Sequence, residues 1–576
     1  MTSFRNLTPA EIAALETFGN SAEDWTKVRV APDFEPFQLH QSHLEGCVEI
    51  ARGARIIRSR VANYHIGEAS LVEGVTALEC RRRSAFGNGT GVATMNECGG
   101  RTVKIFDRLS TQVAYVMAVY RHRPQTIAAL EKMVDAYAEE RSSEIGEVGS
   151  DCRIVGARFI REVRIGNGVE IDGASILENA TLCDGVRIGV DVKAYDTVAA
   201  ENAVIGNGSI VERCFVGESC RLDKGFTAAE SLFFANSHCE NGEAASIFAG
   251  PYTVSHHKSS LLIAGMFSFF NAGSGSNQSN HLFKSGAVHQ AVHLRGCKFA
   301  SSAYIMSPAL EGAFTMVMGH HSYHHDTSAF PYSYLIEKDG HSHLMPGANL
   351  TSFGAVRDIE KWPARDRRSV CRDVINFEEY NPYVAGAMVE AVNILHGLEE
   401  RDPDAPVYTH NKAIIRATAL RRGLKLYNKA IVAALGAMLG KGSLDPHYDG
   451  SGRWLDLAGQ YITRREVTAI LDAVERGEFA TTAAVDNRFR VFAVHYDDYA
   501  HSWAKQVYAA LLGHTPTVDE IDEAISAGHN AHASMRRTTD ADRDRDCSLD
   551  MAVSYGLDCD NDDDRREDYY TVRGLK

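Results

Sequence analysis

An aliphatic residue followed directly by glycine recurs along the middle of this chain of 576 residues. Between residues 145 and 217 the pairs are Ile145-Gly146, Ile165-Gly166, Ile188-Gly189, Ile205-Gly206 and Val216-Gly217. In the clearest stretch, Ile165, Ile171, Leu177 and Cys183 lie six residues apart. A chain that turns every six residues, with one side chain pointing into a narrow three-sided interior and small residues at the corners, produces this period. The sequence therefore predicts a parallel β-helix.

An antiparallel sandwich with glycine-rich turns is the alternative fold for this stretch. Its strands would alternate apolar and polar residues over five or more positions between turns. The period here is six, which favours the β-helix. A slip of one residue at Ile188-Gly189 indicates a looped corner.

Changes in the residue pattern divide the chain into six segments. The fold class we expect is a β-solenoid plus α, with a helical hairpin inserted into the β-helix and a mostly α-helical C-terminal region. The segments are 1–45, an N-terminal helical segment opened by the capping box Thr8-Pro9-Ala10-Glu11; 46–107, the first coils; 108–146, the helical insertion; 147–362, the main β-helix with His-rich loops; 363–535, the α-helical region; and 536–576, a charged tail.

Composition narrows the classes of partner. The net charge of -15 argues against nucleic acid, whose phosphates require a clustered positive field. No apolar run approaches the roughly 20 residues needed to cross a bilayer. The twelve cysteines form no regular disulfide framework, which suits a reducing compartment. We therefore expect a cytoplasmic protein that acts on a small molecule, without nucleic acid or membrane as partner.

Histidines are concentrated in one part of the predicted β-helix. Eleven of the 24 lie between Ser255 and His343, together with amides and cations. Imidazoles can act as general bases, and amides and cations can orient anionic or carbonyl-bearing substrates. A surface on which neutral polar side chains form ladders between coils is the alternative. We interpret the cluster as a candidate site.

The candidate roles follow from the surroundings of each residue. His281, His320 and His321 are the candidate catalytic bases, because each follows a Gly- or Asn-rich corner whose backbone amides could polarise a carbonyl group. The candidate substrate-binding residues are His256, His257, Lys258, Asn271, Asn277, Gln278, Asn280, Lys284, His289, Gln290, Arg295 and Lys298.

A metal site is a second interpretation of the same region. His320, His324, His325 and Asp326 offer a dense set of ligands for zinc. Adjacent histidines on a strand, however, point to opposite faces. We therefore expect no metal in the first interpretation and name these four residues as ligands in the second.

Three segments carry a resemblance to a known superfamily. Ile165-Gly166-Asn167-Gly168-Val169, Ile171-Asp172-Gly173-Ala174 and Ile205-Gly206-Asn207-Gly208 resemble the repeats of the hexapeptide-repeat transferases, which form left-handed β-helices. The resemblance implies a histidine base, a donor such as acyl-coenzyme A bound between neighbouring coils, and a homo-oligomer whose adjacent subunit completes the groove. The whole chain also resembles an uncharacterised family of large bacterial hexapeptide-repeat proteins with a helical C-terminal region.

These observations lead to one expected function and two alternatives. We expect a transferase that moves an acyl or other activated carbonyl group onto a small polar acceptor, such as a sugar or a nucleotide-linked compound. The first alternative is a non-catalytic scaffold or regulatory binding protein. The second is a metal-dependent enzyme similar to the β-helix carbonic anhydrases, which bind zinc through histidines of adjacent coils.

Overall fold

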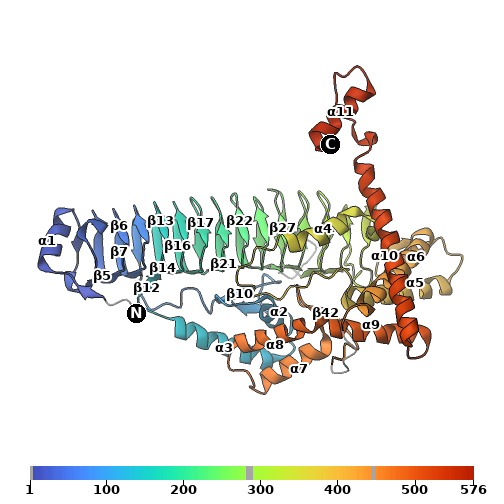
Figure 1. The fold of residues 1–576 in the computed structure, drawn as a ribbon, viewed down its shortest axis with the longest axis horizontal. Helices are drawn as coiled ribbons and strands as arrows, with labels where there is room; N and C mark the ends of the chain where they lie inside the picture. Colours follow the sequence, from blue (N-terminus) through green and yellow to red (C-terminus); the bar gives the residue numbers. More distant parts are fainter. Residues whose placement is uncertain (1–3, 280–289, 443–447, 576) are drawn as a thin grey trace.

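A long parallel β-solenoid and a mostly helical C-terminal region make up the structure (Figure 1), a computed structural model that describes residues 4–279, 290–442 and 448–575. The expected fold class, a β-solenoid plus α, is confirmed. Among the described residues, the structure contains no helix that combines the length and the apolar character needed to cross a membrane.

One face of the solenoid is a stack of short strands in parallel register. Each contributes one interior side chain, and successive interior residues such as Ile154, Ile171 and Ile188 lie 17 positions apart. Between residues 153 and 272, the strands of this face are β13 (Arg153–Val155), β15 (Glu170–Asp172), β17 (Arg187–Ile188), β20 (Val204–Ile205), β22 (Arg221–Asp223), β24 (His238–Glu240), β27 (Val254–Ser255) and β30 (Asn271–Ala272).

The coils from β13 to β24 repeat after 17 residues, one fewer than three hexads, which corrects the expected spacing. The interior partner of Ile165 in the next coil is Leu182, while Cys183 is partly exposed. The strands that bend at this corner are β14 (Phe159–Ile165), β16 (Ile176–Leu182), β21 (Ile210–Val216) and β23 (Thr227–Phe233). In each, a single residue with φ of 46–50° makes the turn, namely Glu162, Asn179, Arg213 and Glu230. The apparent slip at Ile188 is therefore shared by the 17-residue coils on either side of it.

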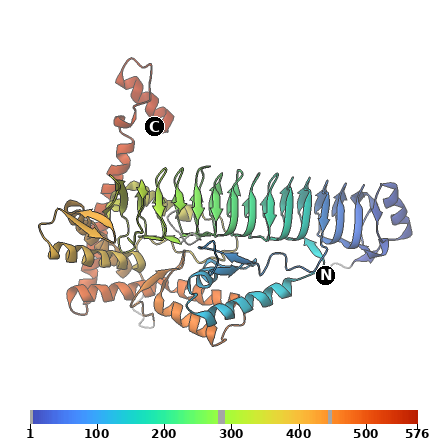
Figure 2. The same cartoon turned by 180° about the vertical axis from the view of Figure 1, so that it is seen from behind.

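The solenoid continues past a long excursion of residues 80–145. Strands β7 (Arg60–Ile66) and β9 (Ala77–Glu79) pair directly with β12 (Gly146–Val148) and β14. The excursion contains the hairpin β10 (Gly91–Ala93) and β11 (Thr102–Lys104), followed by α2 (Thr111–Val119) and α3 (Pro124–Arg141). Figure 2 shows these elements lying alongside the coils.

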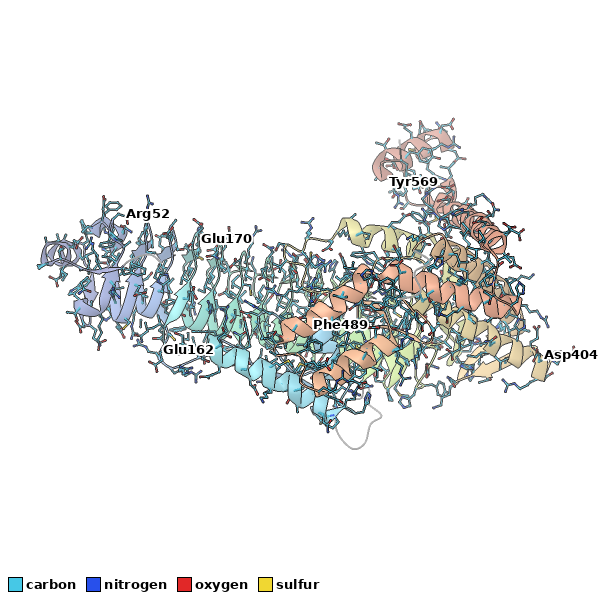
Figure 3. All side chains as sticks on the ribbon, turned by 60° about the horizontal axis from the view of Figure 1, so that its bottom comes forward. Arg52, Glu162, Glu170, Asp404, Phe489 and Tyr569 are labelled. Atoms are coloured by element: carbon cyan, nitrogen blue, oxygen red, sulfur yellow. The ribbon has the colours of Figure 1, made fainter. Side chains whose placement is uncertain are left out.

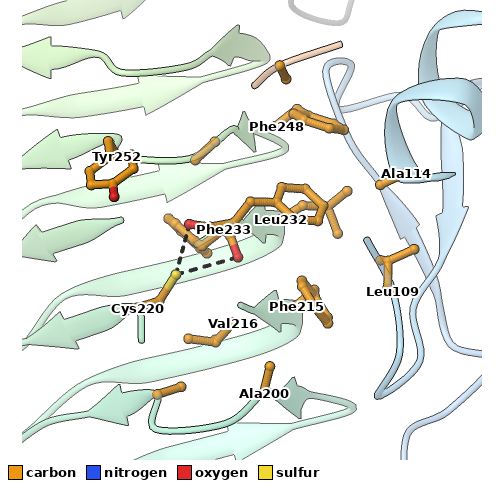
Figure 4. Packing of buried hydrophobic residues seen from close by; sticks show 14 of the residues in the cluster. Leu109, Ala114, Ala200, Phe215, Val216, Cys220, Leu232, Phe233, Phe248 and Tyr252 are labelled. Carbon is orange, nitrogen blue, oxygen red and sulfur yellow. Dashed lines mark hydrogen bonds between the residues drawn. The ribbon is translucent and has the colours of Figure 1, made fainter. Parts of the chain in front are cut away.

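The excursion covers an apolar exterior stripe of the solenoid. Phe215 is in register with Leu232, and Leu232 with Phe248. Figure 4 shows Leu109 and Ala114 facing this stripe, and all five side chains are buried. The stripe is apolar because α2 and the residues before it cover it and exclude water.

The N-terminal end is closed by α1 (Pro9–Thr17). The Thr8 side chain accepts a hydrogen bond from the Glu11 backbone, and Glu11 caps the Thr8 backbone in return. This is the predicted capping box. Leu15 is the buried residue of the helix.

The C-terminal region begins with a change of strand direction. Strand β38 (Tyr334–Lys338) continues the solenoid, and β39 (His341–Met345) pairs with it antiparallel. The helices after it are α4 (Phe353–Ala364), α5 (Pro382–Arg401), α6 (Ala417–Leu439), α7 (Arg464–Glu475), α8 (Thr482–Val494), α9 (Tyr496–Leu512), α10 (Val518–Asp546) and α11 (Asp562–Arg573). The end of α10 and α11, with Tyr569, project from the body (Figures 1 and 3).

Candidate functional site

A cleft lies between one face of the solenoid and a roof formed by α4 and residues 365–373, which we call the strap. Its volume is about 900 Å³. The lining residues of the solenoid come from the coils that carry β17 through β30. In Figure 1, α4 lies beside the coils near β27. A cleft of this volume can hold a nucleotide-sized molecule.

Helix α4 is fixed to the coils by charge and by packing. The Ser352 side chain caps it by accepting a hydrogen bond from the Gly354 backbone. Asp358 forms an ion pair with Lys298 of the solenoid and a second, of 3.2 Å, with Lys361. The Trp362 ring packs edge-on against Phe269, with ring centroids 4.6 Å apart. The roof is therefore a built part of the fold.

The strap is hydrogen-bonded to the corners of three successive coils. Asn202, Ser219 and Asn236 occupy the same corner position, each with a positive φ. Asn202 donates to the Ser369 hydroxyl (2.9 Å), and Ser219 donates to the Arg367 carbonyl (2.8 Å). Asn236 accepts from the Arg367 backbone (3.1 Å). The corners thus determine where the strap runs.

The lining of the cleft is strongly cationic. It contains Arg187 and Arg221 from the coils, Lys361 from α4, and Arg365 and Arg367 from the strap, against a single carboxylate, Asp358, among the described lining residues. The side chains of Arg365 and Arg367 have no acidic partner in the described part of the chain. Unpaired guanidinium groups lining one cleft favour an anionic ligand.

Two imidazoles meet on the floor of the cleft. The rings of His238 and His256 are 4.5 Å apart and edge-on. His238 Nε2 lies 2.9 Å from Glu240 Oε1, which orients that ring. Burial, and then the neighbouring His238, lower the pKa of His256 from its usual value. His256 is therefore neutral near pH 7 and able to accept a proton.

Three of the predicted site residues line this cleft. They are His256, His257 and Asn271. Lys258, the next residue after the two histidines, is exposed but does not line the cleft. The N-terminal end of the His-rich segment therefore contributes residues to the cleft.

Other predicted residues lie inside the solenoid. Gln278 Nε2 is 2.5 Å from His293 Nε2, and Nδ1 of the same imidazole contacts Glu311, with all three side chains buried. His321 is buried, with its Nδ1 2.8 Å from the Ser342 hydroxyl. Because these side chains face the interior, no substrate in the cleft can reach them.

Two predicted cations hold parts of the chain together. Arg295 is buried in an ion pair with Asp456 (2.8 Å), between the rings of Phe269 and Tyr461. Lys298 forms the ion pair that anchors α4. Both groups are occupied by structural contacts.

The remaining predicted residues are spread over different surfaces. His320, His324 and Asp326 are exposed, and His325 is buried. Gln290 accepts a hydrogen bond from Arg101 of the excursion (2.8 Å), and Asn277 is half-buried. The structure does not bring the described members of the His-rich set to one cleft. Asn280, His281, Lys284 and His289 lie outside the described residues.

The structure places no metal-binding cluster at the predicted zinc ligands. Within residues 4–279, 290–442 and 448–575, no three His, Cys, Asp or Glu side chains are grouped so that they could hold a metal ion. His324 is exposed while His325 is buried, as expected for neighbours that point to opposite sides of the chain.

Sequence reasoning missed the cationic half of the cleft. Arg187, Arg221 and His238 occupy register-matched exterior positions in their coils, and the strap adds Arg365 and Arg367. A spacing of 17 residues would have aligned the coil residues. The Asn202, Ser219 and Asn236 corners show the same spacing.

Comparison with known proteins gives two family matches. A family described as "Domain of unknown function (DUF4954)" matches residues 54–399, which is more than half of the chain and includes the whole cleft. The chain belongs to this family. A second family, "Domain of unknown function (DUF6819)", matches residues 442–575, which include α7 through α11.

One relative extends the comparison. An uncharacterized protein of Treponema pallidum (strain Nichols) is 24% identical over 465 residues, which cover 69% of this chain and 62% of the relative. The match therefore spans less than two thirds of that relative's length. The family matches do not include a hexapeptide-repeat transferase family, so the resemblance to a large uncharacterised family is confirmed and the transferase assignment stays a prediction.

Proposed function

We propose that the cleft binds an anionic small molecule and transfers an acyl or other activated carbonyl group from it to a polar acceptor. The observation that carries this proposal is that Arg365 and Arg367, which have no acidic partner among the described residues, line a cleft with a pair of imidazoles. The other three cations of the lining, Arg187, Arg221 and Lys361, are paired with acids. A donor such as acyl-coenzyme A, or a nucleotide-linked acceptor, has phosphates that suit Arg365 and Arg367.

His256 is the base in this proposal. The acceptor N–H or O–H gives its proton to the neutral imidazole as the acceptor atom bonds to the thioester carbonyl carbon. The carbon–sulfur bond then breaks, and the departing thiolate takes the proton from the His256 imidazolium, which returns to its neutral form. His238, held by Glu240, keeps the His256 ring in place.

The roof replaces a wall that the expected homo-oligomer would take from a neighbouring subunit. In the superfamily that the repeats resemble, a neighbouring subunit usually supplies the second wall of the groove. Here α4 and the strap of the same chain supply it. We propose that substrate binding needs one chain, whatever the oligomeric state, and that the protein works in the cytoplasm without membrane or nucleic acid.

Ligand binding tests the proposal. Calorimetric titration with coenzyme A, acetyl-coenzyme A and a nucleotide-sugar should reveal at least one ligand that binds the full chain. The double variant Arg365→Ala/Arg367→Ala should weaken that binding about tenfold or more, since each charge-assisted hydrogen bond contributes substantially. The backbone contacts of the strap remain in this variant.

A matched control separates the cleft from general surface charge. Arg52 and Arg153 are exposed on coils outside the cleft, and Figure 3 shows Arg52 near the N-terminal end. Arg52→Ala/Arg153→Ala should leave binding unchanged. Binding that responds equally to both pairs of substitutions contradicts the cleft. Binding without turnover, with acceptors of several classes, favours the scaffold or regulatory alternative.

A further inference from the structure

A second cavity is lined by residues of both family matches. Its volume is about 260 Å³. Glu378, Glu379 and Tyr380 come from the first match, and Tyr496, Asp497 and His532 from the second. We call it the junction cavity. Its volume is below the roughly 300–1,000 Å³ of pockets for drug-sized ligands, so it suits a smaller molecule.

The charge of the junction cavity is opposite to that of the cleft. Glu378, Glu379 and Asp497 line it, against the single ammonium group of Lys441 among the described lining residues. The lining therefore contains two more carboxylates than ammonium groups. Ala437 and Met438 add the C-terminal turn of α6, whose partial charge is also negative. Asp497 lies in the first turn of α9, where its charge opposes the partial positive charge of the helix N-terminus.

Two polar groups in the lining have no partner. The Tyr496 side chain is 4% exposed, and its buried hydroxyl makes no hydrogen bond in the described structure. Glu379 is half-buried, and its carboxylate has neither a hydrogen bond nor an ion pair with any described residue. Burial raises the pKa of Glu379, opposed mainly by His532 and Arg536. A buried hydroxyl and a carboxylate left unpaired beside a cavity indicate that a donor is missing.

Two other side chains of the lining, Tyr380 and Glu378, already have partners. Tyr380 lies 2.6 Å from His532 Nδ1, and Glu378 accepts a hydrogen bond from Asn376 (3.0 Å). These contacts fix the walls while Glu379 and Tyr496 stay free to bind.

We propose that the junction cavity binds a small aliphatic diamine as its diammonium cation, with one ammonium group donating to Glu379 and to the Tyr496 hydroxyl oxygen. Two positive charges match the excess of carboxylates in the lining, and ammonium groups supply donors, which the carboxylate requires and the hydroxyl oxygen can accept. Because residues of both family matches line the cavity, the diamine joins the two parts of the chain and stabilises their contact.

Calorimetric titration of the full chain with 1,4-diaminobutane tests this proposal, with 1,4-butanediol as the uncharged control of similar shape. The diamine should bind and the diol should not. Glu379→Gln should weaken diamine binding about tenfold or more, since it removes a charge-assisted hydrogen bond. Glu360→Gln is the matched control, because Glu360 pairs with Arg536 and does not line the cavity.

Tyr496→Phe provides a second, independent readout. Without ligand, this variant should melt at a higher temperature than the native chain, because a buried hydroxyl without a partner is removed. The diamine should raise its melting temperature less than it raises that of the native chain. Equal binding of diamine and diol, or undiminished diamine binding by both Glu379→Gln and Tyr496→Phe, would overturn the proposal. Neither result depends on the function of the cleft.

Discussion

His293 is hydrogen-bonded to Glu311 inside the solenoid, where most coils carry aliphatic or aromatic side chains. Both side chains are fully buried, and the imidazole stacks on the rings of Phe267 and Phe270. The pair joins two adjacent coils, since the two residues are in register. Removing one member of such a buried pair strongly destabilises the fold, whereas replacing both members by apolar residues changes its stability much less.

The first prediction concerns this pair. His293→Leu should destabilise the solenoid by about 3–5 kcal/mol, because it leaves the Glu311 carboxylate buried without its partner. Adding Glu311→Leu should recover most of that loss. Urea unfolding followed by circular dichroism for both single variants and the double variant measures the coupling. Additive losses in the double variant would contradict a direct interaction.

The second prediction concerns the joint between the solenoid and the helical region. Arg295→Lys should destabilise the contact nearly as much as Arg295→Ala, since only a planar guanidinium group can pair with Asp456 while lying between Phe269 and Tyr461. We expect a loss of about 3–5 kcal/mol for the alanine variant. Limited proteolysis and thermal unfolding measure it. Arg52→Ala, at an exposed ion pair, should cost less than about 1 kcal/mol.

The third prediction concerns proton binding by His256. Its pKa is lowered by burial and by His238, so the ring should titrate below the usual value of about 6.5. Any turnover that uses it as a base should fall as the pH drops through that lowered pKa. The NMR signal of the labelled ring carbon reports the titration, with His256→Gln assigning the signal. A pKa above the usual value would contradict this environment.

The fourth prediction concerns Asp486 in α8, which accepts a hydrogen bond from the Ser110 hydroxyl (2.5 Å). Burial raises its pKa to about 7, although that hydrogen bond opposes the rise. A carboxyl group whose pKa is raised on folding stabilises the fold below its unfolded pKa, and this contribution is lost as the pH rises through about 7.

Thermal unfolding between pH 5 and pH 8.5 measures that dependence. Asp486→Asn should unfold with little change over this range and should be more stable than the native chain at the alkaline end, by about 1–2 kcal/mol because the side chain keeps some solvent contact. Asp404→Asn, at an exposed loop acid labelled in Figure 3, should leave the native dependence unchanged. A native chain equally stable at both ends of the range contradicts the raised pKa.

Local chemistry made part of the architecture predictable. The spacing of Ile165 and Ile171 predicts a β-helix with a three-sided interior. Thr8 with Glu11 predicts the start of α1. Both predictions depend on residues that are close in sequence. The corner at Asn179 was not predicted. The residue with positive φ varies between coils, with Glu, Asn and Arg all occurring there, so no single residue type marks it.

The candidate site was predictable in part. A local excess of imidazoles drew attention to His256 and His257, which line the cleft. The same excess included His293 and His321, which face the interior. A change of one position along a strand moves a side chain from one face to the other, so composition cannot separate the two groups.

By itself, the sequence determined that this protein winds into a parallel solenoid and ends in helices, because a short period and helix caps act over a few residues. Only the tertiary structure decided that Arg365 and Arg367 lie over Arg187 and Arg221, and that Glu379 and Tyr496 share a cavity. These pairings join positions more than a hundred residues apart. They arise because the strap is hydrogen-bonded to the corners of the coils and the helices pack against one another, interactions that leave no periodic trace in the chain.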